Sequence, residues 1–214
     1  MMNKKEGIWI CVTGIDGVGK TSLCNYLTKV LDKKAQFMKI PYFDWVREMI
    51  QISGNNQPNK DKHTDMLIFS AGNRLEMYLI NDYLKKCNFL ITQRCWLDNF
   101  PYRKVQGISL KESLYFLKPN KFRKPDIILF LKCNYMTAYK RIKNQNGDKY
   151  EELKFMKQLE KEFEKMFAQI KSNKFPIKFS KTKIITIDAS KSLAEIKKEA
   201  KNKLKNLCIY CSGP

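Results

Sequence analysis

Short apolar runs recur along the chain, and each has the length and composition of a β-strand. The first run, Ile8 to Thr13, is rich in β-branched residues and ends at a glycine, which is typical of a buried strand. Pro41 closes the second run, and Pro125 stands just ahead of the fourth. The pattern predicts four further strands, at Gln36 to Ile40, Phe89 to Thr92, Ile127 to Leu131 and Lys183 to Ile187.

Longer segments between these runs have helical spacing. In Lys20 to Leu31, apolar residues fall three or four positions apart, so one face of the helix is apolar. Residues 96 to 117 mix a loop with helical segments, and Ser53 to Asp61 is a polar loop rich in Asn, Gly and Pro. Similar patterns predict helices at Trp45 to Ile52, Met66 to Lys86, Tyr135 to Lys143, Tyr150 to Lys171 and Leu193 to Leu207.

This alternation of strands and helices predicts the fold class. Strands separated by helices form a parallel sheet with helices on both faces, so we expect an α/β architecture. A length of 214 residues fits one domain, residues 1–214, without repeats or an internal boundary. Asn144 to Lys149 is polar and contains a glycine, and we interpret residues 143–151 as a small mobile lid.

Composition narrows the class of protein further. The formal net charge is +20, which suits anionic ligands, but lysine is spread along the whole chain and only six basic residues are arginine. Spread lysine is typical of a solvated surface, so specific nucleic-acid binding is not expected. No apolar run approaches the roughly 20 residues that cross a membrane, and the charged start of the chain does not resemble a secretory leader. We therefore expect a cytoplasmic protein.

The seven cysteines do not form a disulfide framework. Four of them lie in predicted strands or helices, where they fit small core residues of a reducing compartment: Cys11, Cys24, Cys87 and Cys133. Cys208 and Cys211 form a lone C-x-x-C without a second pair, and His63 is the sole histidine, so the sequence leaves the role of this motif open.

One motif carries specific chemistry. The pattern G-x-x-x-x-G-K-[ST] stands between a predicted strand and a predicted helix, which is the context of a phosphate-binding P-loop. Its glycines let backbone amides turn toward phosphates at a helix N-terminus, while Lys20 can reach the β- and γ-phosphates and Thr21 can hold Mg²⁺. The matching residues are Gly14, Ile15, Asp16, Gly17, Val18, Gly19, Lys20 and Thr21. We therefore expect the three-layer P-loop NTPase fold.

Two other classes of P-loop protein fit less well. GTPases read guanine with an Asn-Lys-x-Asp motif, whereas Asn59, Lys60 and Asp61 have the wrong spacing and lie in a polar loop. Motor-type ATPases place an acid at the end of an apolar strand, but Ile127 to Leu131 leads into Lys132.

With these motifs in place, the sequence resembles the thymidylate kinase family over most of its length. The P-loop within Thr13 to Ser22 is similar to that family's G-x-D-G-x-G-K-[ST], and Phe69 to Arg74 resembles its F-x-A-x-x-R. Further resemblances follow in the family's order: Gln93-Arg94-Cys95 to Asp-Arg-Tyr, Tyr102 to the next motif tyrosine, Pro125-Asp126 to the P-D strand, Arg141 with Asp148 to Glu151 to the lid, and Ile187 to Ser190 to the loop near the adenine.

The resemblance implies transfer of phosphate from ATP to a nucleoside monophosphate, foremost dTMP, with Mg²⁺ and in a homodimer. It assigns Lys20, Arg94 and Lys149 to catalysis and Thr21 to the metal. The implied ATP site comprises Gly14, Asp16, Gly17, Val18, Gly19, Lys20, Thr21, Ser22, Arg141 and Ala189, and the implied acceptor site Asp16, Arg47, Phe69, Arg74, Arg94 and Tyr102. Five of the acceptor residues also fit structural roles: Phe69 and Tyr102 in the core, Arg47 and Arg74 at the surface, and Asp16 as a turn cap.

Three departures from the family pattern keep alternatives open. Gln93 replaces an aspartate that helps to arrange the metal, Lys149 replaces the lid arginine, and Arg103 stands where a glutamine is common. The alternatives are a deoxynucleoside kinase and a nucleotide-binding protein with weakened turnover. A nucleoside kinase must deprotonate a 5′-hydroxyl, for which Gln93 cannot be the base, whereas a monophosphate acceptor is already anionic.

Overall fold

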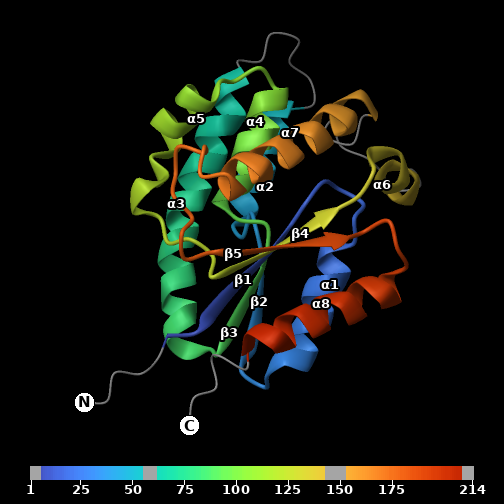
Figure 1. Cartoon of the computed structure of the whole chain (residues 1–214). Coiled ribbons are helices and arrows are strands. Elements are labelled where there is room, and N and C mark those ends of the chain that lie inside the picture. Colours follow the sequence, from blue (N-terminus) through green and yellow to red (C-terminus); the bar gives the residue numbers. More distant parts are fainter. Residues whose placement is uncertain (1–5, 55–61, 143–152, 209–214) are drawn as a thin grey trace.

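The computed structural model describes residues 6–54, 62–142 and 153–208 (Figure 1). Its centre is a sheet of five parallel strands in the order β2-β3-β1-β4-β5. The strands are β1 (Ile8–Thr13), β2 (Ala35–Lys39), β3 (Phe89–Gln93), β4 (Ile127–Lys132) and β5 (Lys183–Asp188). All five predicted strands are confirmed, with ends that differ by at most one residue.

Helices cover both faces of the sheet and complete three layers (Figure 1). The helices are α1 (Lys20–Leu31), α2 (Asp44–Gly54), α3 (Lys62–Lys86), α4 (Asn99–Val105), α5 (Leu110–Leu117), α6 (Tyr135–Ile142), α7 (Leu153–Lys171) and α8 (Leu193–Cys208), with short 3₁₀ helices η1 (Trp96–Asp98) and η2 (Pro119–Lys121). Helices α1 and α8 pack together on one face, while α3, α4, α5 and α7 pack together on the other. No helix in the described ranges is long and apolar enough to cross a membrane.

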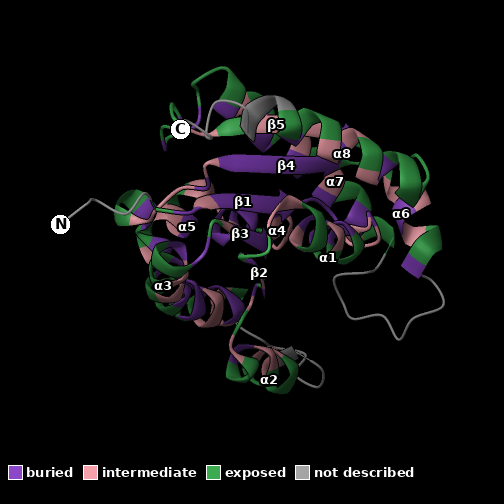
Figure 2. Cartoon of the chain, turned by 90° about the horizontal axis from the view of Figure 1, so that it is seen from below, coloured by how far each residue is buried: buried purple, intermediate pink, exposed green. Residues whose placement is uncertain are grey.

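The register of the central strands places the functional loops side by side. Strand β1 lies between β3 and β4, with Val12 paired to Gln93 and Thr13 to Phe130. Nearly every residue of β1 and β4 is buried, as Figure 2 shows in purple. The loop after β1 and the residue after β3, Arg94, therefore meet at the same edge of the sheet, the usual ligand edge of open α/β folds.

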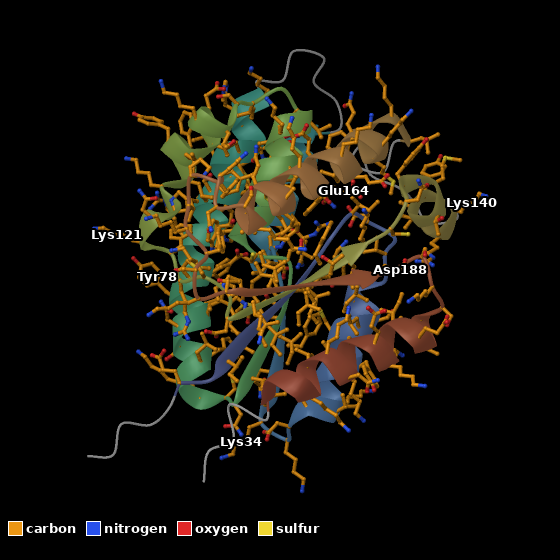
Figure 3. The ribbon with its side chains drawn as sticks, viewed as in Figure 1. Lys34, Tyr78, Lys121, Lys140, Glu164 and Asp188 are labelled. Carbon is orange, nitrogen blue, oxygen red and sulfur yellow. The ribbon has the colours of Figure 1, made fainter. Side chains whose placement is uncertain are left out.

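The exposed lysines and most of the element boundaries agree with the expectations from the sequence. Charged side chains such as Lys34, Lys121 and Lys140 extend outward on different sides of the molecule (Figure 3). The predicted mixed segment, residues 96 to 117, resolves into η1, α4 and α5. The expected lid, residues 143–151, and Cys211 lie outside the described residues. The four cysteines expected in the core are buried and free.

Candidate functional site

The loop between β1 and α1 has the backbone geometry that its glycines permit. Gly14, Gly17 and Gly19 have φ angles of 142°, 80° and 87°, in a region that side chains with a Cβ rarely enter. A Cβ at Gly14 would also lie 2.6 Å from the carbonyl oxygen of Leu131, and one at Gly17 would collide with the carbonyl of Ala138. The loop thus closes tightly against β4 and α6 and leads directly into α1.

Lys20 opens α1 and is almost fully buried, with 4% of its surface exposed. Its Nζ donates to the carbonyl oxygen of Ile15 at 2.6 Å and to Asp16 Oδ1 at 3.1 Å. Burial, and then the nearby Arg94 guanidinium, lower the pKa of Lys20 to about 8. The ammonium is therefore held over the loop as a cation that an anionic ligand would stabilise.

The next residue, Thr21, forms a hydrogen bond with Gln93, the β3 residue that replaces the family's aspartate. Its Oγ1 donates to Gln93 Oε1 at 2.8 Å. Hydroxyl and amide oxygens are hard donors of the kind that Mg²⁺ accepts, so this pair suits a magnesium ion that also contacts phosphates. The amide is neutral, however, and contributes less to binding a cation than an aspartate would at the same place.

Arg94 links the P-loop to the neighbouring pocket. It has a φ angle of 74°, an unusual conformation for a residue with a Cβ and one that often marks functional sites. Its Nη2 donates to Asp16 Oδ1 at 2.5 Å and its Nη1 to Asp98 Oδ1 at 3.3 Å. Its guanidinium also lies 4.9 Å from the centre of the Tyr102 ring. A nearly buried cation is thus fixed between two carboxylates and an aromatic face.

The pKa values of the two carboxylates around Arg94 are shifted in opposite directions. Burial works to raise the pKa of Asp16, but Arg94 and Lys20 hold it well below its usual range, and Tyr102 Oη donates to its Oδ2 at 2.8 Å. Burial raises the pKa of Asp98, which accepts from Thr13 Oγ1 at 2.6 Å and from the Cys95 backbone at 3.1 Å. Asp16 therefore acts as a fixed anion, while Asp98 is held inside the protein.

A cavity of about 350 Å³ opens beside Arg94. Its walls come from the ends of β2 and β3 and from α2, α3 and α4. Five of the six predicted acceptor residues line it: Asp16, Arg47, Phe69, Arg94 and Tyr102. Arg47 donates to the Pro41 carbonyl at 2.5 Å and to Asp44 at 2.7 Å. Across the cavity, the Arg103 guanidinium stacks 4.9 Å from the Phe69 ring centre, so the aromatic face is backed by a cation.

The sixth predicted acceptor residue, Arg74, does not line this cavity. It is exposed on α3, where its Nη2 donates to the Leu117 carbonyl at 2.9 Å and its guanidinium lies 5.7 Å from the Phe122 ring. Its neighbour Asn73 lines the cavity instead and is buried. The cavity is therefore lined by the residue before Arg74, and the role expected of Arg74 stays a prediction.

On the other side of the P-loop, the structure brings two more predicted residues together. Arg141 on α6 donates from Nη1 to the Ala189 carbonyl at 2.8 Å, and from Nη2 to the carbonyls of Ser190 and Lys191 at 3.2 Å each. The loop after β5 is thus tied to α6 near Gly17, which packs on the same helix. Lys149 lies outside the described residues.

The residues that sequence reasoning missed include Asn73 and Asn99, which line the cavity, and Glu76, which is bonded to Asn73. Asn73 stands four residues after Phe69, a spacing that places both on one helix face, so helical phase was a usable signal. Asn99 and Glu76 had no such signal, because Asn99 depends on the contact of α4 with α3, and Glu76 on the contact of α3 with the segment after β2.

The site consists of a phosphate-binding loop with a buried lysine and a separate cavity, and Arg94 lies between them. This arrangement defines a P-loop phosphotransferase with separate donor and acceptor sites. The sequence model of the thymidylate kinase family matches residues 12–200. The chain therefore belongs to the thymidylate kinase family, and it is a kinase.

Individual relatives agree with this assignment. The chain is 31% identical over 177 residues to a probable thymidylate kinase of Methanococcus vannielii, covering 81% of this chain and 82% of that protein. It is 27% identical over 195 residues to probable thymidylate kinase 1 of Saccharolobus solfataricus, covering 89% and 93%. The solved structure of thymidylate kinase from Candida albicans has the same fold, with a TM-score of 0.74 over 94% of this chain and 92% of that one, at 19% identity.

Proposed function

We propose that the protein transfers the γ-phosphate of ATP to a nucleoside monophosphate, foremost dTMP, and so produces dTDP and ADP. The observation that carries the proposal is Arg94, which stands between the P-loop and the acceptor cavity and is fixed by Asp16 and Asp98. Two polyanions must meet for this reaction, and converging cations reduce their repulsion. The names of the family and of its curated relatives support dTMP as the acceptor.

On the donor side, the backbone amides of the loop from Gly14 to Ser22 would hold the phosphates, with Gly17, Val18 and Gly19 giving the tightest part of the cradle. Lys20 would exchange its bond to Ile15 for a bond to the β- and γ-phosphates. Arg141 and the backbone at Ala189 would border the adenine. Lys149 remains the proposed lid cation.

Mg²⁺ fits the oxygen donors beside the loop. Thr21 would contribute its hydroxyl, and Gln93, now paired with Thr21 at 2.8 Å, would orient it. When bound together with ATP, the ion would neutralise charge on the transferring phosphate. Because Gln93 is neutral, this chain would depend on the phosphates themselves for most of its magnesium affinity.

On the acceptor side, Arg94 and Arg47 would bind the monophosphate, and Phe69 would stack on the base. Asp16, held by Tyr102, would accept a hydrogen bond from the sugar. The site offers a nucleoside kinase little help, since Gln93 cannot accept a proton and Asp98 is already bonded to Thr13, Arg94 and Cys95. This arrangement favours an acceptor that is already an anion.

Calorimetric titration with ATP and with dTMP, paired with a coupled turnover assay, tests the proposal. We expect both ligands to bind and dTDP to accumulate. Binding of both ligands without product would contradict the proposal and indicate a nucleotide-binding protein that has lost turnover.

We predict that kcat/KM for ATP declines with rising pH above about 8. This parameter reports the free enzyme, in which Lys20 has a pKa lowered to about 8 and loses its charge above that value. Bound phosphates favour the charged form and raise this pKa again, so kcat should stay level over the same range. Equal declines of both parameters, or none in either, would contradict the assignment of Lys20.

We also propose a homodimer formed through the outer face of α3. Leu67, Leu75 and Tyr78 are 49%, 44% and 75% exposed and fall on one side of the helix, and Figure 3 shows Tyr78 projecting outward. Such a stripe on a helix face suits an isologous contact with a second copy.

The L75E/Y78E double variant should weaken such a dimer by at least about tenfold, because each interface would bury unpaired carboxylates. Light scattering after size exclusion should give twice 25.3 kDa for the wild type and 25.3 kDa for the variant. Tyr115→Glu on α5, which is 67% exposed, is the matched control and should stay dimeric. A wild type that is monomeric at every concentration would contradict the proposal.

A further inference from the structure

A buried carboxylate lies behind the acceptor cavity and has no role in the phosphate chemistry. Glu76 on α3 has no exposed surface and accepts hydrogen bonds at both oxygens. The Tyr42 backbone N–H donates to Oε1 at 2.8 Å, and Asn73 Nδ2 donates to Oε2 at 2.9 Å. The carboxylate thus joins the segment after β2 to a residue that lines the cavity.

The hydrogen bonds continue from Asn73 to α4. Asn73 Oδ1 accepts from Asn99 Nδ2 at 2.6 Å, and the same nitrogen donates to the Trp96 carbonyl at 3.1 Å. We call Glu76, Asn73 and Asn99 the polar relay. Its ends fix its direction, because the Trp96 carbonyl can only accept and the Tyr42 N–H can only donate.

A fixed direction determines what the relay offers to a ligand. Both hydrogens of Asn99 Nδ2 are used, which leaves Asn99 Oδ1 as an acceptor, and Asn73 Nδ2 keeps one hydrogen as a donor. Both residues line the cavity together with Phe69, which can stack on a base. The relay therefore leaves one acceptor and one donor free, in a set order, on two residues that line the cavity with Phe69.

We propose that Glu76 is a specificity-determining positioning residue, which orders this donor and acceptor so that the site selects bases with adjacent carbonyl and N–H groups. Thymine and uracil have this edge: N3–H would donate to Asn99 Oδ1, and O4 would accept from Asn73 Nδ2. Cytosine has the reverse order, an amine beside an unprotonated ring nitrogen, and both contacts would be repulsive. The inference rests on the proposed function, since it concerns the acceptor of that reaction.

The relay requires a carboxylate at position 76. A glutamine there would have to accept from the Tyr42 N–H through its oxygen and would then turn its NH₂ toward Asn73. Asn73 could satisfy that donor only by reversing its amide, which would turn its NH₂ toward the NH₂ of Asn99. Asn99 cannot reverse in turn, because its oxygen would then face the Trp96 carbonyl, so the order of the donor and the acceptor would be lost. Leaving buried polar groups unpaired is the basis of strong discrimination between substrates that differ in hydrogen bonding.

The test compares kcat/KM for dTMP with kcat/KM for dCMP in the wild type and in Glu76→Gln. We expect the ratio to fall by about tenfold or more in the variant, because the contacts that distinguish the two bases are lost while the contacts to phosphate and sugar, which both substrates share, remain. Glu48→Gln removes the same charge from an exposed position on α2 and should keep the wild-type ratio. An unchanged ratio in Glu76→Gln would overturn the relay, whereas a wild type that phosphorylates no monophosphate would contradict the proposed function instead.

A pH profile of the wild type provides a test that does not depend on folding of the variant. Burial raises the pKa of Glu76 to about 7, and below that value the protonated carboxyl can itself donate to Asn73. The groups that face Glu76 are the Tyr42 N–H, Asn73 and, from α2, the Arg47 guanidinium. The ratio of dTMP to dCMP should therefore be smaller at pH 6 than at pH 8. A constant wild-type ratio would overturn the proposal.

Discussion

Replacing Arg94 with alanine should lower kcat by about a thousandfold or more, since an arginine on the transferring phosphate contributes on that scale in related phosphoryl transfers. Its guanidinium is oriented by Asp16 at 2.5 Å and Asp98 at 3.3 Å and needs no reorganisation when the acceptor binds. The affinity for ATP should change far less, because the donor phosphates are held by the P-loop.

Single-turnover kinetics and ATP titration would separate these two effects. The alanine variant also leaves Asp16 and Asp98 without their cation, so its thermal stability should fall, and Arg94→Lys is the matched control for charge. The lysine variant should recover stability but only part of the rate, because it lacks two parallel donors. A loss of ATP affinity with an intact acceptor affinity would contradict the role given to Arg94.

Replacing Lys20 with alanine should reduce kcat by about a hundredfold or more, comparable to the loss of one preorganised donor to a developing charge. The fold should persist, because Asp16 keeps its bonds to Arg94 and Tyr102 after the lysine is removed. Circular dichroism and the coupled assay would measure both quantities. Lys29→Ala, an exposed lysine on the same helix, is the matched control, and turnover near the wild-type rate in Lys20→Ala would contradict the phosphate cradle.

The strands and the P-loop could be predicted from the sequence because their signals are local. A buried parallel strand is a short apolar run, and the loop's glycines are required by backbone angles such as those at Gly14 and Gly17. The position of Arg94 also followed from local order, since a residue just after a strand lies at the ligand edge of the sheet.

Helical phase separates the two ends of the motif from Phe69 to Arg74. Arg74 stands five positions after Phe69, a rotation of about 140° beyond one full turn, so the two side chains diverge. Asn73, four residues from Phe69, shares its face and lines the cavity. Helical phase thus accounts for the presence of Asn73 among the residues that line the cavity.

Other parts of the site depend on contacts between distant segments, which single-sequence patterns do not contain. The bond from Thr21 to Gln93 joins residues 72 positions apart, and the one from Tyr42 to Glu76 spans 34 positions. In the sequence, Glu76 is an ordinary polar residue of a long helix. Its role depends on the packing of α3 against the segment after β2.

The acceptor that this site favours is a nucleoside monophosphate with a thymine base. The direct test measures initial rates with ATP and Mg²⁺ against thymidine, dTMP, dUMP, dCMP and dGMP under the same conditions. We expect the highest kcat/KM for dTMP, with dUMP next and dCMP far below. Thymidine phosphorylated faster than every monophosphate would contradict it, and would mean that Asp16 or Asp98 accepts the proton of a 5′-hydroxyl.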